Sequence, residues 1–280
     1  VHQILEDFIA EVLARPEADR PGPSDPWTVD DHLRLQEIGE LRCDEAEANG
    51  ITGRPIFWKR DRRRILSDLD LFLVADARYR AAHQTVPIAV ELGFGFGDLD
   101  AVAVPLPDGR QLRVRGRADR LDRAVDGTLH VVDYKTGRFS DSYRGLSEDD
   151  PVKAGPKLQL PLYGQAARLA EGRPDAPVRA NYWFPTTRGE FKRTGYVITD
   201  DVLAITVATL GVIVHGVESG VFPPHPDGAG TFFYVACEVC DPDGLGTVEL
   251  HSHWERKLGD SALADYVALV VPSDEEAGVA

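Results

Sequence analysis

The feature that most constrains the fold of this chain is a change in the spacing of its apolar residues near residue 86. Before that point apolar residues recur every three or four positions, which predicts amphipathic helices over residues 2–14, 28–50 and 61–83. Four prolines between residues 16 and 26 separate the first two helices, because proline has no amide proton to donate. The first third of the chain is therefore expected to be mainly helical.

After this point, short runs with β-type composition alternate with helical patterns. The expected strands cover residues 86–94, 101–105, 111–116, 128–135, 179–184 and 191–198, and the expected helices cover 157–171, 200–219 and 254–271. Asp126-Gly127 is typical of a tight hairpin, so the strands on its two sides should be adjacent and antiparallel. This order predicts an α/β fold with a central mixed sheet flanked by helices.

The size and composition favour one globular domain. A chain of 280 residues that is 43% hydrophobic can bury a large core. It has no long apolar run and no signal peptide at its start, which predicts a cytoplasmic protein without a membrane partner. The sequence contains no Met and begins Val1-His2, as expected for a piece of a longer polypeptide. We expect a single domain over 1–271 (helical insertion 16–85, catalytic core 86–222, C-terminal cap 223–271), followed by an acidic tail over 272–280.

The net charge of -15 argues against a protein that holds nucleic acid through its overall field, since phosphate binding relies on lysine and arginine. Basic residues do cluster locally. One cluster spans residues 59–64, and the other comprises Arg113, Arg115, Arg117, Arg120 and Arg123. The first cluster fits a solvated charged helix face at least as well as a binding site. A phosphate ligand would therefore need a local site.

Asp133-Tyr134-Lys135 stands at the end of a predicted strand and carries the most specific chemistry. Asp133 and Lys135 share one face, because side chains alternate along a strand. A hard divalent cation needs oxygen ligands, and Asp119 from the neighbouring strand end would supply a second carboxylate. A metal there would activate water, while Lys135 would orient that water or neutralise charge on a phosphate. The triplet alone is weak evidence, so its neighbours have to supply the specificity.

Five segments in order along the chain supply it. They are Val1-His2-x-x-Leu5-Glu6-x-Phe8, Glu91-Leu92-Gly93-Phe94-Gly95, Gly116-x-x-Asp119-Arg120-x-Asp122, Val132-Asp133-Tyr134-Lys135-Thr136-Gly137 and Leu158-Gln159-Leu160-Pro161-Leu162-Tyr163. Together they resemble the RecB-type branch of the PD-(D/E)xK nucleases, which includes nuclease domains of bacterial helicase-nuclease recombination complexes. The resemblance spans most of the chain. It implies a restriction-endonuclease-like core and a Mg²⁺- or Mn²⁺-dependent DNA exonuclease of repair or recombination, acting with a helicase partner or a helicase domain of the parent chain.

The resemblance also assigns the metal ligands and the catalytic lysine. Position by position, the family pattern makes His2, Asp119 and Asp133 the side-chain ligands, with the carbonyl of Tyr134 as a further oxygen donor. Lys135 takes the place of the catalytic lysine. A lone histidine in the first turn of a helix is more often a cap or a surface residue, so the role of His2 depends on the resemblance.

Further residues are expected to support this site or to contact the substrate. Gln159 and Tyr163 lie at i and i+4 on one helix face and match the family's Gln-x-x-x-Tyr motif, which supports the active site and contacts DNA. Glu91 matches an additional acidic position, and the resemblance leads us to expect substrate contacts from Arg117 and Arg120. Gln159 and Tyr163 could instead be an ordinary helix pair, and Glu91 could pair with a nearby arginine.

A second open choice concerns which aspartate of the third segment binds metal. Asp122 stands three residues after Asp119 and could be the ligand instead, although the family pattern favours Asp119. The two alternatives differ in where the carboxylate lies along the strand.

The cysteines match only part of a second family pattern. Many members of this family hold an iron-sulfur cluster with one upstream and three C-terminal cysteines, but this chain has only three Cys in all. Cys237 and Cys240 form the Cys-x-x-Cys pair, whereas Gly246 stands where the next Cys is expected and Cys43 follows the first helix. We expect a structural knuckle without a cluster. Zinc bound by both cysteines and some of three histidines is the alternative; these are His225, His251 and His253.

Two other functions compete with the nuclease. The first is a non-catalytic module of nuclease fold that scaffolds a repair complex or holds DNA, against which the complete set of Asp119, Asp133 and Lys135 speaks. The second is a small Cys/His metal-binding interaction domain over residues 225–253. Metal binding that depends on Asp119 would separate the nuclease from the scaffold, and metal analysis of the purified protein would test the Cys/His domain.

Overall fold

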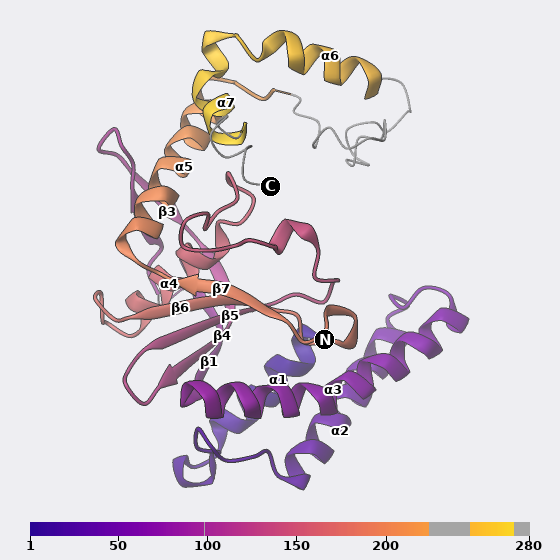
Figure 1. The fold of residues 1–280 in the computed structure, drawn as a ribbon. Coiled ribbons are helices and arrows are strands. Elements are labelled where there is room, and N and C mark those ends of the chain that lie inside the picture. The colour runs from indigo at the N-terminus through magenta and orange to yellow at the C-terminus, as the bar shows by residue number, and fades with distance from the viewer. Residues whose placement is uncertain (98, 224–246, 272–280) are drawn as a thin grey trace.

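The computed structural model describes residues 1–97, 99–223 and 247–271 of the chain. Helices cover both faces of a central mixed sheet (Figure 1), which confirms the α/β prediction. The helices are α1 (His2–Ala14), α2 (Val29–Ala48), α3 (Pro55–His83), α4 (Gln159–Ala170), α5 (Asp200–Glu218), α6 (Thr247–Lys257) and α7 (Ala264–Val270). The strands are β1 (Thr85–Phe94), β2 (Val102–Pro105), β3 (Gln111–Val114), β4 (Gly116–Ala124), β5 (Leu129–Tyr134), β6 (Val178–Trp183) and β7 (Arg193–Val197).

The five-stranded sheet has the order β1-β4-β5-β6-β7, and β2 and β3 form a separate two-stranded sheet. β5 and β6 are parallel, while the other neighbouring strands of the large sheet are antiparallel. β4 and β5 are joined by the predicted hairpin, in which Gly127 has a φ of +85° and the amide of Thr128 donates to Asp126 Oδ1 at 2.8 Å. β5 lies in the middle of the sheet, so its carboxyl end is a fixed position for side chains.

β4 is an element that the spacing of apolar residues did not predict. The strand expected over 111–116 ends at Val114 and pairs only with β2, and a separate strand begins at Gly116. β4 carries charged residues on a buried face, where Arg120 and Asp122 are both 0% exposed. Alternation of apolar and polar residues fails to reveal such a strand, because its buried charges are neutralised by one another.

Each face of the sheet has its own apolar core. α4 covers one face, where Leu160 and Ala167 pack against Val131 and Tyr182. The other face is covered by α1, α2 and α3, the indigo to purple helices of Figure 1, with Phe8, Phe72 and Trp183 in its core. The first segment of the chain is therefore packed directly on the sheet.

Two helix boundaries differ from the sequence prediction. α3 begins at Pro55, six residues before the expected start, because proline suits the first turn of a helix, where an amide proton has no partner. The single helix expected over 254–271 is wrong: α6 ends at Lys257, and α7 begins at Ala264. Gly259 and the capping side chain of Asp260, which accepts from the amide of Ala262, break it.

α5 is long and apolar enough to cross a membrane by length and composition. That observation is weak evidence, because the core helix of a globular domain passes the same test. α5 buries Val202, Thr206 and Leu210 and lies beside α4 and α7.

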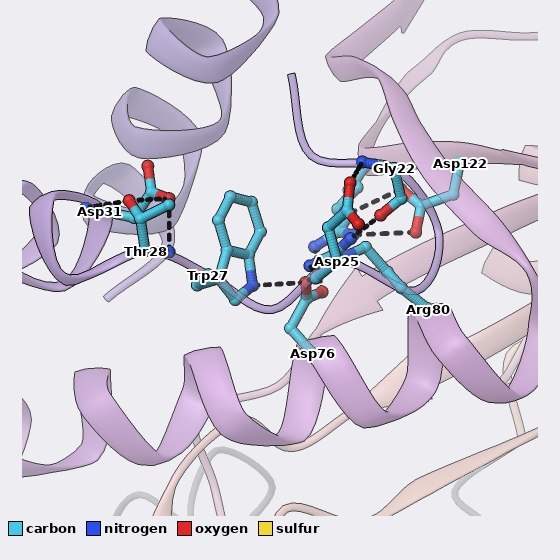
Figure 2. Close-up of polar contacts among 9 residues, drawn as sticks. Gly22, Asp25, Trp27, Thr28, Asp31, Asp76, Arg80 and Asp122 are labelled. Atoms are coloured by element: carbon cyan, nitrogen blue, oxygen red, sulfur yellow. Dashed lines mark hydrogen bonds and ion pairs between the residues drawn. The ribbon is translucent and has the colours of Figure 1, made fainter. Parts of the chain in front are cut away.

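A buried group of four charged side chains joins α3 to β4. Asp76 Oδ1 accepts from Arg120 at 2.7 Å, Asp76 Oδ2 accepts from Arg80 at 2.9 Å, and Arg120 also bonds both oxygens of Asp122. All four side chains are 0% exposed. Figure 2 shows that Arg80 in addition reaches the connector between α1 and α2, where it donates to the carbonyl groups of Gly22 and Asp25. The group therefore ties the helical layer, the connector and the sheet together.

We expect Asp76→Ala to destabilise the protein by about 3–5 kcal/mol, because it leaves two buried guanidinium groups without their shared carboxylate. Urea unfolding followed by circular dichroism measures the change. Glu218→Ala is the matched control, since it removes an exposed carboxylate that also pairs with an arginine, Arg110. Similar unfolding free energies for both variants would contradict the structural role of the buried group.

Candidate active site

The antiparallel pairing of β4 with β5 brings Asp119 to the end of β5. The register pairs Arg120 with Val132, so the next residue outward on β4 is Asp119. The Oδ2 atom of Asp119 accepts a hydrogen bond of 2.6 Å from the amide of Tyr134. The side chain is 18% exposed, so this carboxylate is held at the rim of the sheet with one side toward solvent.

Asp133, Lys135 and Gln159 form one connected polar group on the face that α4 covers. The ammonium of Lys135 forms an ion pair with Asp133 Oδ2 and donates to Gln159 Oε1 at 3.0 Å. Gln159 Nε2 donates to Asp133 Oδ1 and to the hydroxyl of Tyr163, both at 3.2 Å. The Gln-x-x-x-Tyr pair therefore touches the Asp-x-Lys pair directly, as the family resemblance leads us to expect.

His2 reaches the same place from the first turn of α1. Its Nε2 atom lies 2.9 Å from the carbonyl oxygen of Tyr134 and 3.6 Å from Asp119 Oδ2. An imidazole nitrogen, a carbonyl oxygen and a carboxylate oxygen thus meet at the end of β5. The structure brings together His2, Asp119 and Tyr134, which the resemblance named as ligands.

The two carboxylates sit in an environment that opposes their negative charge. Burial, and then the charge of Asp133, raises the pKa of Asp119 to about 6. Burial also raises the pKa of Asp133, against the opposing effect of Lys135. A buried carboxylate pair of this kind favours either a proton or a cation.

These residues fit a divalent cation in their chemistry, although not in their present contacts. Within residues 1–97, 99–223 and 247–271, no group of three or more His, Cys, Asp or Glu side chains is arranged to hold an ion. Asp133 is turned toward Lys135, and His2 Nε2 is turned to the carbonyl of Tyr134. Asp133 Oδ2 is nevertheless a buried oxygen whose partner is the Lys135 ammonium, and oxygen donors are what Mg²⁺ and Mn²⁺ prefer.

Glu91 lies beside this group on β1. It stands between the register pairs Val90–Arg120 and Leu92–Ala118, opposite Asp119, and its charge contributes to the raised pKa of Asp119. Its φ is +48°, which is unusual for a residue other than glycine inside a strand. Its carboxylate pairs with Arg117 Nη1 at 3.2 Å, so the alternative of a nearby arginine partner is what the structure shows.

Of the two arginines expected to contact the substrate, only Arg117 is accessible. Its side chain is 59% exposed beside Glu91. The expectation for Arg120 is wrong, because this side chain is completely buried between Asp76 and Asp122. Asp122 is excluded as the alternative metal ligand for the same reason, since both of its oxygens accept from Arg120.

Three side chains near Lys135 were not anticipated from the sequence. The ammonium of Lys135 lies 5.1 Å from the ring centre of Tyr182, and that of Lys157 lies 3.4 Å from the ring centre of Tyr143. Burial, and then the charge of Lys135, lowers the pKa of Lys157. A cation resting on an aromatic ring has no spacing signal in the sequence, because the ring comes from another element, β6 for Tyr182 and the turn Asp141–Tyr143 for Tyr143.

The remaining candidate groups do not join this site. Two arginines of the cluster over 59–64 on α3 form ion pairs with nearby acidic residues: Arg62 contacts Glu40 and Asp44 of α2, and Arg64 contacts Asp61. This favours the solvated-face interpretation. Cys43 is buried and free. The expected knuckle around Cys237 and Cys240, with His225, lies outside the described residues, as does the side chain of His251. His253 is exposed on α6.

The middle strand of this sheet ends in Asp133-x-Lys135, and the adjacent strand supplies Asp119. This arrangement is typical of nuclease-type α/β folds. The chain belongs to the PD-(D/E)XK nuclease superfamily, whose family model matches residues 1–243. This membership confirms the resemblance carried by the five segments.

Two curated relatives are each named as a subunit of an "ATP-dependent helicase/deoxyribonuclease". The one from Symbiobacterium thermophilum is 31% identical over 219 residues, covering 64% of this chain and 17% of the relative. The one from Desulforudis audaxviator is 42% identical over 106 residues, covering 35% of this chain and 8% of the relative. The chain thus spans less than a fifth of the length of either relative.

Among solved structures, the likeness is weaker. The crystal structure of SSO0001 is 17% identical with a TM-score of 0.30, covering 85% of this chain and 90% of that chain. A likeness at that TM-score supports no conclusion.

The raised pKa of Asp119 predicts a pH-dependent stability in the presence of a chelator. Between pH 3.8 and about 6, the folded state keeps a proton on Asp119 that the unfolded chain has already released. This contribution favours folding at low pH and is lost as the pH rises through about 6. Asp119→Asn removes the titration and keeps an oxygen for the amide of Tyr134.

Urea unfolding at a series of pH values measures this effect. The variant should gain stability relative to the unaltered protein as the pH rises from about 4 to about 7. A difference in unfolding free energy that stays constant over this range would show that the pKa of Asp119 is not raised.

Proposed function

We propose that this chain is a metal-dependent deoxyribonuclease domain that hydrolyses phosphodiester bonds at the end of β5. The observation that carries the proposal is the meeting of Asp119, Asp133 and Lys135 at the ends of two paired central strands. Nucleases of this superfamily generally use divalent metal ions such as Mg²⁺. Membership in the superfamily supports a nuclease, and the geometry supports these residues as its active site.

His2, Asp119, Asp133 and the carbonyl of Tyr134 are the proposed metal ligands. When bound, Mg²⁺ or Mn²⁺ would activate a water molecule and neutralise charge on the phosphate. Asp119 is preorganised for this role by the 2.6 Å bond from the amide of Tyr134. Asp133 requires a turn of its carboxylate away from Lys135, and the raised pKa of both carboxyls favours the arrival of a cation.

Lys135 is the proposed catalytic lysine. Its ammonium is held by Gln159 Oε1 at 3.0 Å and lies next to Asp133, so it can orient a water molecule or donate to a phosphate oxygen. Gln159 positions Lys135 and Asp133 together, and Tyr163 anchors Gln159 through its hydroxyl. Gln159, Tyr163 and Arg117 remain proposed contacts for DNA.

We further propose an exonuclease that works with a helicase in DNA repair or recombination. The support is the name that the two relatives share, together with the acidic character of the chain. A protein with a net charge of -15 captures DNA poorly by itself, so delivery of the strand by a motor fits its surface. A DNA substrate also fits the cytoplasmic location expected from the sequence. The single-domain organisation over 1–271 remains part of the proposal.

Digestion of DNA with Mg²⁺ or Mn²⁺ tests the active site. Asp133→Asn and Lys135→Gln should each lower the cleavage rate by at least about 100-fold, because each removes a group that acts on the reacting phosphate. Asp126→Asn and Lys257→Gln are matched controls of the same chemistry on the hairpin and on α6, and they should cut normally. Cleavage that survives Asp133→Asn would rule out the proposed site.

The same assay tests the exonuclease assignment. Linear DNA should be degraded while covalently closed circular DNA stays intact, since an exonuclease needs a free end. Equal digestion of both forms would show an endonuclease at the same site.

Binding of Mn²⁺ distinguishes the enzyme from a non-catalytic scaffold. Calorimetric titration should show a site whose dissociation constant rises at least about tenfold in Asp119→Ala, the loss of one charged ligand. Asp126→Ala is the control. Mn²⁺ binding that is absent, or insensitive to Asp119→Ala, would favour the scaffold.

A further inference from the structure

A polar cavity opens on the sheet face opposite to α4. It has a volume of about 320 Å³, and α3, β6 and β7 line it with Tyr79, His83, Arg179, Asn181 and Arg193. It is separate from the candidate active site, because Arg179 pairs in register with His130, three residues before Asp133. That register corresponds to about 10 Å along the strand. The Asp133 side chain in addition faces Gln159 on the other side of the sheet.

Arg193 is fixed at the centre of this cavity wall. Its guanidinium lies 3.6 Å from the ring centres of both Tyr79 and Trp183, and Nη1 donates to Asn181 Oδ1 at 3.2 Å. Nη2 is buried and has no hydrogen-bond partner among the described residues. An arginine held flat between two rings is preorganised for a ligand, since little side-chain entropy remains to be lost.

The cavity carries excess positive charge. Neither Arg179 nor Arg193 forms an ion pair in the part of the chain that the structure describes. The carboxylates whose charge reaches Arg193 belong to Asp76 and Asp122, and both already bond other arginines. Burial, and then the charges of Arg179 and Arg193, lowers the pKa of His83. An anion would relieve this local repulsion.

An aromatic surface borders the charged wall. The rings of Tyr79 and His83 lie 4.3 Å apart, and the hydroxyl of Tyr79 is 2.8 Å from His130 Nδ1. His83 is exposed. Gly195 contributes no side chain, so backbone forms part of the wall. Guanidinium groups beside the exposed ring of His83 match the phosphate and the base of a nucleotide.

We propose that the cavity formed by Arg179, Arg193 and His83 is a phosphate-binding site distinct from the active site. Arg179, which is only partly buried, donates to the phosphate at the mouth, and Arg193 provides fixed positive charge behind it. The phosphate belongs to a free phosphate ligand or to a DNA strand. The DNA source depends on the proposed nuclease function, whereas phosphate binding itself does not.

A titration followed by NMR tests the proposal. The full chain carries isotope labels in its histidine side chains, and the titration is done with a chelator present at constant ionic strength. The probes are inorganic phosphate and a single-stranded thymidine tetranucleotide, and the signal is the imidazole resonance of His83, assigned with His83→Gln. Phosphate should shift this resonance saturably toward the protonated position, because an anion offsets the nearby arginine charges. Arg179→Gln should raise the dissociation constant at least about tenfold, as expected for loss of a charge-assisted hydrogen bond.

Arg54→Gln is the matched control. It makes the same charge change about 38 Å from Tyr79, measured along α3. It should bind as the unaltered protein does. Tighter binding of the tetranucleotide than of phosphate assigns the site to a DNA strand, and binding of phosphate alone assigns it to a free phosphate ligand. Absence of a saturable His83 shift with both probes overturns the proposal, as does an equal effect of Arg54→Gln. The unaltered protein decides this even if Arg179→Gln fails to fold.

The outcome is independent of cleavage. Phosphate binding by a protein that never cuts DNA would leave this site standing and remove the nuclease proposal. Metal-dependent cutting without a His83 shift would do the reverse.

Discussion

The buried ion pair between Asp76 of α3 and Arg120 of β4 is the contact on which the rest of the structure depends. It joins the helical layer to the central strands, and through Arg80 it also holds the connector that leads from α1. α1 packs in the same layer and presents His2 to the end of β5. Charges taken out of water are costly unless each is fully bonded, so this group specifies one arrangement of helices on the sheet.

Two carboxylates, those of Asp119 on β4 and Asp133 on β5, lie close together although their charges repel each other. Burial and the charge of Asp133 raise the pKa of Asp119, while Lys135, Gln159 and the amide of Tyr134 hold the two carboxylates in place. A divalent cation would offset the electrostatic repulsion between the two carboxylates. Two local groups of positive side chains in this acidic chain lie near Lys135 and in the cavity around Arg193.

Much of this was predictable from the sequence, for reasons specific to particular elements. The helix over 2–14 and the hairpin at Asp126-Gly127 follow from periodicity and from the left-handed glycine that such turns need. The contact between Gln159 and Tyr163 follows from their i, i+4 spacing. β4 could not be predicted by pattern, because Arg120 looks like a surface residue until Asp76 and Asp122 are placed around it.

The sequence by itself determined the class of fold, the Asp-x-Lys pair and the superfamily, since these depend on local spacing and on residues next to one another. Only the tertiary structure decided that Arg120 is a core residue, that Glu91 pairs with Arg117, and that Arg193 stands between two rings. The physical reason is that the environment of a charged side chain is set by partners far away along the chain. Burial and pairing, which decide whether a charge binds a ligand or holds the fold, arise only when those partners meet.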